Sequence, residues 1–216
     1  MQLKSDLFGT VTRVERRTGA EVTLLVQRDV RAARWWLRPL AHALSRREAR
    51  ALDALRAVAG VPQLRGFEGG VLTRSWLEGE PMQRARPRDP RYFRDALTLL
   101  RRLHRAGVAH NDLAKETNWL VRPDGSAGLV DFQLAVVSLR RSRLFRTLGR
   151  DDIRHLLKHK RTYCPGRLTR RELQVLATPS LINRAWMGSG KKVYTFITRR
   201  VLGWADREGA GDRKWQ

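Results

Sequence analysis

The segment between residues 110 and 133 constrains the fold of this chain more than any other. Near its middle, Asp124-Gly125 is a strong signal for a tight turn between two β-strands. The apolar runs on either side, Trp119-Leu120-Val121 and Leu129-Val130, have the length and composition of short buried strands. The sequence therefore predicts a β-hairpin here, with Pro123 in a loop of two or four residues.

The open end of this hairpin is a predicted cation site. A turn centred on Asp124-Gly125 pairs Asn118 with Asp131, because both residues lie equally far from its centre. Side chains paired in this way lie about 5 Å apart on one face of the ribbon. An amide oxygen and a carboxylate are ligands that hard cations prefer, so we expect Asn118 and Asp131 to bind a metal ion.

Together with Asp112, these residues resemble the catalytic loop and metal-binding triplet of the protein-kinase-like superfamily. The resemblance implies that Asp112 orients the attacking hydroxyl, with Lys115 as a neighbouring catalytic cation, and that Asn118 and Asp131 hold Mg²⁺ on ATP. Two departures from protein kinases are one extra residue between Asp112 and Asn118, and Gln133 in place of glycine.

The N-terminal residues resemble a kinase phosphate-covering loop. Phe8-Gly9-Thr10-Val11 looks like the end of that loop, which implies that Gly9 and Val11 contact the nucleotide. Lys4 and Asp6 replace its other two glycines, so we expect backbone amides to approach the phosphates less closely than in typical kinases.

The third-strand lysine of kinases has Arg28 in its place, after an alternating stretch from Val22 to Val26. Arginine keeps the charge but presents a planar fork of donors. A helix predicted from Ser45 to Leu55 carries Glu48, which resembles the helix-C glutamate that pairs with this cation. The alternative is that Ser45 and Glu48 form a capping box at the start of that helix.

Val71 to Gly79 reads as a strand entering a turn and resembles the hinge that receives adenine, with Arg74 and Trp76 as candidate nucleotide contacts. Asp89-Pro90 then predicts the start of a helix that ends at Ala106-Gly107. One face of that helix carries an apolar stripe typical of a core-facing surface: Phe93, Leu97, Leu100 and Leu103.

After Asp131 the chain is short and basic, and it lacks the Ala-Pro-Glu motif of peptide-docking kinases. Asp151-Asp152 predicts the cap of a helix that runs to about Lys160, and another short helix is predicted from Thr169 to Ala177. The only cysteine, Cys164, excludes an internal disulfide and fits a reducing compartment.

The charge indicates anionic partners. The 44 Lys and Arg against 21 Asp and Glu give a formal net charge of +23, which attracts phospholipid headgroups, phosphorylated glycolipids or nucleic acid. No signal peptide or membrane span is predicted, so we expect a cytoplasmic protein, or one peripheral on the inner face of the membrane. The sequence gives no indication of the oligomeric state.

Two apolar groups among these charges have alternative interpretations. The segment 191–205 predicts an amphipathic helix that lies on an anionic membrane or packs on the rest of the chain. Trp35-Trp36, among arginines, suits either a membrane interface or packing between lobes.

The complete pattern predicts one α+β domain over residues 1–216 with a protein-kinase-like two-lobed fold. A small β-rich N-lobe with one helix C would span about residues 1–78, and a reduced, mainly helical C-lobe about 79–190.

The chain resembles the bacterial lipopolysaccharide core (Kdo and heptose) kinases and the RIO-like atypical Ser/Thr kinases. This implies phosphoryl transfer from ATP, with Mg²⁺, to a glycolipid sugar or, alternatively, a protein hydroxyl. A weakly active or inactive module that binds membrane or RNA is a third hypothesis, with nucleic acid the less favoured partner.

Overall fold

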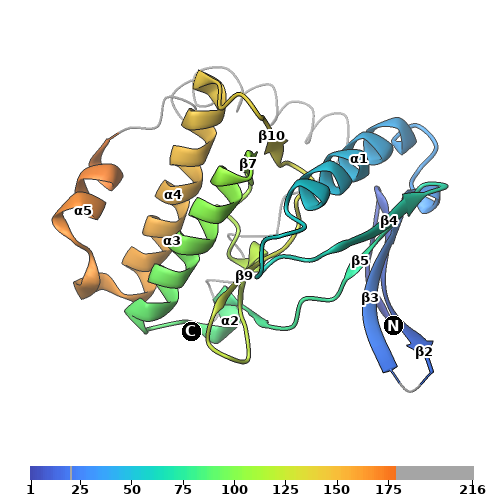
Figure 1. Cartoon of the computed structure of the whole chain (residues 1–216), viewed down its shortest axis with the longest axis horizontal. Helices are drawn as coiled ribbons and strands as arrows, with labels where there is room; N and C mark the ends of the chain where they lie inside the picture. The colour runs from blue at the N-terminus through green and yellow to red at the C-terminus, as the bar shows by residue number, and fades with distance from the viewer. Residues whose placement is uncertain (20, 179–216) are drawn as a thin grey trace. The chain divides into compact units, whose positions relative to one another are not determined.

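The computed structural model describes residues 1–19 and 21–178. The chain divides into two compact units, Met1–Leu168 and Thr169–Gln216. Within the first unit, the N-terminal part is built on a β-sheet and the rest mainly on helices, as Figure 1 shows. This is the α+β architecture that the sequence predicts. The amphipathic segment predicted at 191–205 lies outside the described residues.

The N-terminal sheet has five antiparallel strands in the order β1-β2-β3-β5-β4. Their bounds are β1 Gln2–Asp6, β2 Gly9–Thr18, β3 Glu21–Asp29, β4 Leu64–Glu68 and β5 Val71–Ser75. The third strand, β3, pairs with both β2 and β5, which places Arg28 between Val11 and Leu72. The predicted third-strand position of Arg28 is therefore confirmed.

A short 3-10 turn, η1 (Val30–Ala32), leads to helix α1 (Arg38–Ala54). The helix begins well before Ser45, with Pro39 in its first turn. The predicted capping box is therefore wrong, because Ser45 and Glu48 lie inside the helix on its buried face. Because Glu48 is buried inside the helix, its carboxylate contacts other buried side chains and does not cap the helix.

The helical part begins with β6 (Glu80–Pro81) and α2 (Met82–Ala85), and helix α3 (Pro90–Arg105) follows. As predicted, the Asp89 side chain caps α3, accepting a hydrogen bond from the Arg91 amide at 2.8 Å. Its buried face joins a core that also includes α1 and the central hairpin. The members of this core include Leu52, Leu55, Leu100, Leu103, Trp119, Leu129 and Phe132.

The predicted hairpin is present as β8 (Trp119–Val121) and β9 (Ala127–Leu129), but its predicted register is wrong by one residue. The loop has three residues, Pro123 to Gly125, because the Arg122 amide donates to the Ser126 carbonyl and the Gly125 amide donates to the Arg122 carbonyl. Gly125 has a φ of +77°, the left-handed conformation that closes a three-residue loop. Asn118 consequently faces Val130 rather than Asp131.

Two short strands, β7 (Val108–Ala109) and β10 (Val136–Val137), pair beside the turn η2 (Glu116–Asn118) and precede helix α4 (Arg143–Tyr163). Ser142 caps α4, accepting a hydrogen bond from the Phe145 amide at 3.2 Å. Asp151-Asp152 therefore lies within α4, and the predicted cap at that position is wrong. Residues 143–150, which include buried Phe145 and Leu148, form the extra turns.

The first unit ends with the 3-10 turn η3 (Pro165–Arg167). In the second unit, helix α5 (Arg170–Ala177) is capped by Thr169 and Glu172, which confirms the short helix predicted there. Within the described parts of both units, no helix is long and apolar enough to cross a membrane.

Candidate active site

Asp131 lies just beyond the β8–β9 ladder, with its backbone in a conformation that is unfavourable for a side-chain-bearing residue. Its φ is +64°, and that of Asn111 in the neighbouring loop is +62°. A left-handed conformation costs such a residue about 1–2 kcal/mol. Strain of this kind concentrates at functional sites, where the surrounding structure enforces it. The Val130 amide, hydrogen-bonded to the Asn118 carbonyl at 3.1 Å, holds the residue before Asp131.

The Asp131 carboxylate has an unsatisfied oxygen. Among the described residues, its buried Oδ1 has no hydrogen-bond partner, and a buried polar atom in this state is costly unless a ligand or ion completes it. Asn118 directs its amide nitrogen at Asp112, donating to the main-chain carbonyl at 2.9 Å and to Oδ2 at 3.1 Å. Its amide oxygen therefore points away from Asp112, and the oxygens of Asn118 and Asp131 fit a hard cation.

The protein supplies only part of a metal coordination sphere. No group of three or more His, Cys, Asp or Glu side chains that could hold a metal occurs in residues 1–19 and 21–178. Mg²⁺ commonly binds one or two protein carboxylates and takes its other ligands from nucleotide phosphates and water. Asn118 and Asp131 therefore suit Mg²⁺ that arrives with a nucleotide.

Asp112 is held by two donors. Lys115 Nζ lies 3.0 Å from Oδ2, the same oxygen that accepts from Asn118. Lys115 itself is more than half exposed, so its ammonium can also reach a bound anion. The structure thus brings together the two predicted catalytic residues, Asp112 and Lys115, and links them through Asn118 to the metal-ligand candidates.

A buried aspartate that the sequence interpretation missed fixes this loop. Asp152 of α4 accepts hydrogen bonds from the His110 amide at 2.8 Å and the Asn111 amide at 2.9 Å. The His104 ring nitrogen lies 3.1 Å from the same carboxylate. The sequence held a signal for this role, because Asp152 falls on the same helical stripe as buried Phe145 and Leu156.

We expect Asp152→Ala to destabilise the protein by about 2–4 kcal/mol, because two buried backbone amides lose their acceptor. Transfer activity should fall further than the population of folded protein explains, since the loop that carries Asp112 loses its support. Urea unfolding and initial rates measured on the same samples separate the two effects. Asp53→Ala, which changes an exposed aspartate in α1, is the control. An Asp152→Ala protein as stable and active as this control would contradict the role of Asp152 in holding the loop.

Glu48 is fully buried between two arginines. Its carboxylate lies 3.6 Å from Arg28 Nε and 3.2 Å from Arg74 Nε. The predicted pair with Arg28 is therefore present, and the Arg74 side chain, a candidate nucleotide contact, points to Glu48 instead. Burial raises the pKa of Glu48 although both arginines lower it, and Asp131 raises it further.

Gln133 contacts the same Arg28 guanidinium. With its amide oxygen facing Arg28, Gln133 accepts from Nη2 at 2.7 Å and from Nε at 3.0 Å, with Nη1 also in contact. This orientation follows from pairing donors with acceptors. The replacement of glycine by Gln133 thus connects the third-strand cation to the triplet that contains Asp131.

Gly9 and Val11, two of the predicted nucleotide contacts, lie at the start of β2. Only Leu7 and Phe8 separate β1 from β2, and any side chain at Gly9 would collide with the backbone carbonyl of Asp29. This close approach explains the glycine without a nucleotide. Val11 lies opposite Arg28 in the sheet, so it is near the predicted phosphate cation. The nucleotide-binding role of both residues stays a prediction.

Trp76 is half-buried at the end of β5. Its amide donates to the Leu24 carbonyl at 2.9 Å, and the Arg13 guanidinium lies 5.5 Å from the centre of its ring. The strand that precedes it, β5, confirms the predicted strand at the hinge. Adenine binding by Trp76 stays a prediction.

No protein-family model matches this chain, and no curated protein matches it significantly. Among solved structures, it is similar to the Rio2 kinase from Chaetomium thermophilum, with a TM-score of 0.57 and 17% sequence identity. The match covers 79% of this chain and 59% of the Rio2 chain. The chain therefore has a protein-kinase-like fold, as predicted. The resemblance to lipopolysaccharide core kinases stays a prediction.

Proposed function

We propose that this chain is an ATP- and Mg²⁺-dependent phosphotransferase that transfers the γ-phosphoryl group to a hydroxyl. The observation that carries the proposal is the buried Oδ1 of Asp131, which has no hydrogen-bond partner in the described part of the chain, next to an asparagine whose amide nitrogen donates to Asp112. A protein-kinase-like fold with these residues in these positions supports nucleotide chemistry.

Each residue then has a distinct task. Asn118 and Asp131 would hold Mg²⁺, and the bound ion would supply positive charge to offset that of the phosphates. Asp112 orients the acceptor hydroxyl and accepts its proton, and Lys115 stabilises negative charge beside it. Arg28, positioned by Glu48 and Gln133, binds the phosphates as the third-strand cation. Catalysis by such a site is mainly alignment and electrostatic stabilisation.

The favoured acceptor is a sugar hydroxyl of a lipopolysaccharide core at the inner face of the membrane. Only residues 138–142 separate β10 from α4, which leaves little chain for docking a peptide, and that short segment is basic. The second candidate, a RIO-like serine/threonine protein kinase, is favoured by the similarity to Rio2 kinase.

Incubation with γ-labelled ATP and a cell extract separated into lipid, protein and nucleic acid tests these acceptors. Label in the glycolipid fraction supports the favoured acceptor, and label in protein supports the RIO-like alternative. Mg²⁺-dependent ATP binding without transfer to any fraction would instead indicate the third candidate, an inactive kinase-like module. The features that favour that module are Arg28 in place of lysine and the two-residue β1–β2 loop.

Arg28→Ala is expected to weaken ATP binding by about 1.5–3 kcal/mol, the size of a lost charge-assisted contact. Arg28→Lys restores the charge as a point cation, and we expect it to retain or raise activity. Isothermal titration with ATP and Mg²⁺ measures the affinity, with exposed Arg65→Ala as the control. Normal affinity in Arg28→Ala would move the phosphate cation elsewhere, with Lys115 the next choice.

A further inference from the structure

The segment between the Asp131 triplet and α4 exposes several large aliphatic side chains. Leu139 is 90% exposed and Leu144 is 62% exposed, and Leu134 and Val137 are each more than a third exposed. Single exposed leucines are ordinary. Four such side chains within residues 134–144 are a local concentration of apolar groups that folding leaves in water, and such concentrations are typical of binding sites.

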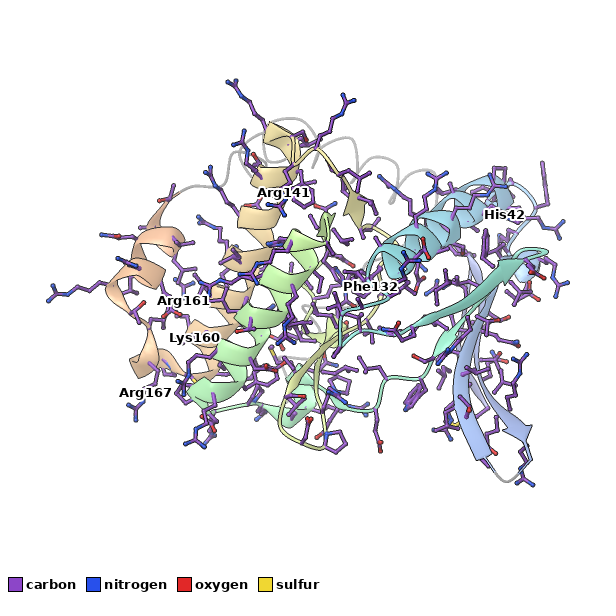
Figure 2. The ribbon with its side chains drawn as sticks, viewed as in Figure 1. His42, Phe132, Arg141, Lys160, Arg161 and Arg167 are labelled. Atoms are coloured by element: carbon purple, nitrogen blue, oxygen red, sulfur yellow. The ribbon has the colours of Figure 1, made fainter. Side chains whose placement is uncertain are left out.

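The same stretch is strongly cationic. Residues 132–150 contain five arginines and no acidic residue. The positive charge continues along one face of α4, within an arc of about 120° over a length of about 27 Å; four of its six basic residues are exposed, and Arg154 and Lys158 are half-buried. The members of this face are Arg143, Arg146, Arg150, Arg154, Lys158 and Arg161, of which Figure 2 labels Arg161.

This apolar and cationic surface borders the catalytic loop. Strand β10 pairs with β7, which ends directly before His110. The Asn111 side-chain amide donates to the Leu134 carbonyl at 3.3 Å. Arg141, labelled in Figure 2, donates to the Arg105 carbonyl at 3.1 Å and ties the segment to α3. A partner bound here would lie beside Asp112.

We propose that residues 134–146 and the basic face of α4 form a docking surface for an anionic phospholipid bilayer. Leu139 and Leu144 enter between the headgroups, and the arginines bind lipid phosphates. Nucleic acid would engage the arginines but not the leucines, because exposed bases stack on aromatic rings, and the only aromatic residue of 134–146 is buried Phe145. This inference rests on the proposed function, since it presents the catalytic loop to an acceptor held in the membrane.

Vesicle co-sedimentation of the full chain, without nucleotide, tests this surface. The vesicles contain phosphatidylcholine and phosphatidylglycerol in a three-to-one ratio, with pure phosphatidylcholine for comparison. We expect Leu139→Ser/Leu144→Ser and Arg140→Gln/Arg143→Gln each to weaken binding at least about tenfold. The controls, Val22→Ser/Leu173→Ser and Arg16→Gln/Arg17→Gln, remove two apolar side chains that are each about half exposed, and an equal charge, elsewhere, and should change binding less than threefold.

Arg143→Glu separates docking from folding. No acidic residue lies in the first turn of α4, so a glutamate there should raise the melting temperature slightly by complementing the helix dipole. The same variant should bind anionic vesicles at least tenfold more weakly. A loss of binding caused by misfolding would be accompanied by a lower melting temperature instead.

Equal vesicle binding by the test and control variants, or no binding at low salt, would overturn the proposal. The proposal would also be overturned if single-stranded RNA displaced the protein from vesicles, and if the arginine variant, but not the leucine variant, bound that RNA more weakly. Asp131→Asn keeps the docking surface, so it should bind vesicles normally while transfer is lost. If the protein transfers phosphate but does not bind vesicles, only the docking proposal is refuted. If it binds vesicles but transfers no phosphate, only the proposed function is refuted.

Discussion

Asp131→Asn is expected to reduce phosphoryl transfer at least about 10³-fold, because the charge that holds the metal on the phosphates is lost while the shape of the side chain is kept. A second readout does not depend on activity. The wild-type protein should gain thermal stability when Mg²⁺ and ATP are added, since a ligand that binds only the folded state stabilises it. Asp131→Asn should lose most of that gain.

The same substitution should stabilise the protein without ligands. The Asp131 carboxylate has a buried oxygen with no hydrogen-bond partner among residues 1–19 and 21–178, and its charge raises the pKa of Glu48. Replacing Asp131 by a neutral amide removes this repulsion, so the melting temperature should rise without Mg²⁺. An Asp131→Asn protein that is less stable than wild type without ligands would show that the carboxylate has a structural role.

Asp112→Asn is the companion variant that separates the two aspartates. Asp112 is held on one oxygen by Lys115 and Asn118, whereas Asp131 has a predicted role in metal binding. We expect its replacement to remove transfer while ATP affinity, measured by titration, changes only a few-fold. Equal losses of ATP affinity in Asp112→Asn and Asp131→Asn would contradict this division of roles.

The residues of the candidate site could be selected from the sequence because their spacing is local, and their roles stay predictions. Asp112, Asn118 and Asp131 lie in one continuous stretch around a recognisable turn. The exact register could not be predicted. Whether Pro123 gives a loop of two, three or four residues depends on which amide closes it, and Gly125 in the left-handed conformation selects three. That one-residue difference places Asp131 outside the ladder.

Contacts between distant segments could not be predicted in the same way. The partners of Asp152, at His110 and Asn111, lie 41 or 42 positions away. In the sequence, Asp152 also resembles a helix N-cap residue, because Asp is common at helix starts. Ser45 and Glu48 have the spacing of a capping box for the same local reason, whereas α1 starts earlier, at Arg38, and buries both. Local signals thus predicted the type of these elements but not which residues they bury.

Glu48→Ala should have the largest effect on stability, about 3–5 kcal/mol, because it leaves two mostly buried arginines without their shared carboxylate. Arg28 and Arg74 are only 15% and 12% exposed, so water cannot replace the ion pairs with Glu48 that both arginines lose. Urea unfolding measures the change, with Asp53→Ala, an exposed acid on the same helix, as the control. A Glu48→Ala protein as stable as this control would mean that the arginines find other partners.

The pH dependence gives a sharper test of the same site. Burial is the largest cause that raises the pKa of Glu48 above its ordinary value of 4.5, so the folded state binds this proton more readily than the unfolded state. The contribution of Glu48 to stability is therefore fully present below pH 4.5 and declines as the pH rises through the raised pKa. Glu48→Gln cannot titrate, so the stability of wild type relative to Glu48→Gln should fall with rising pH over that window. A difference that grows with pH would show that Arg28 and Arg74 outweigh burial, and that Glu48 is held as an anion.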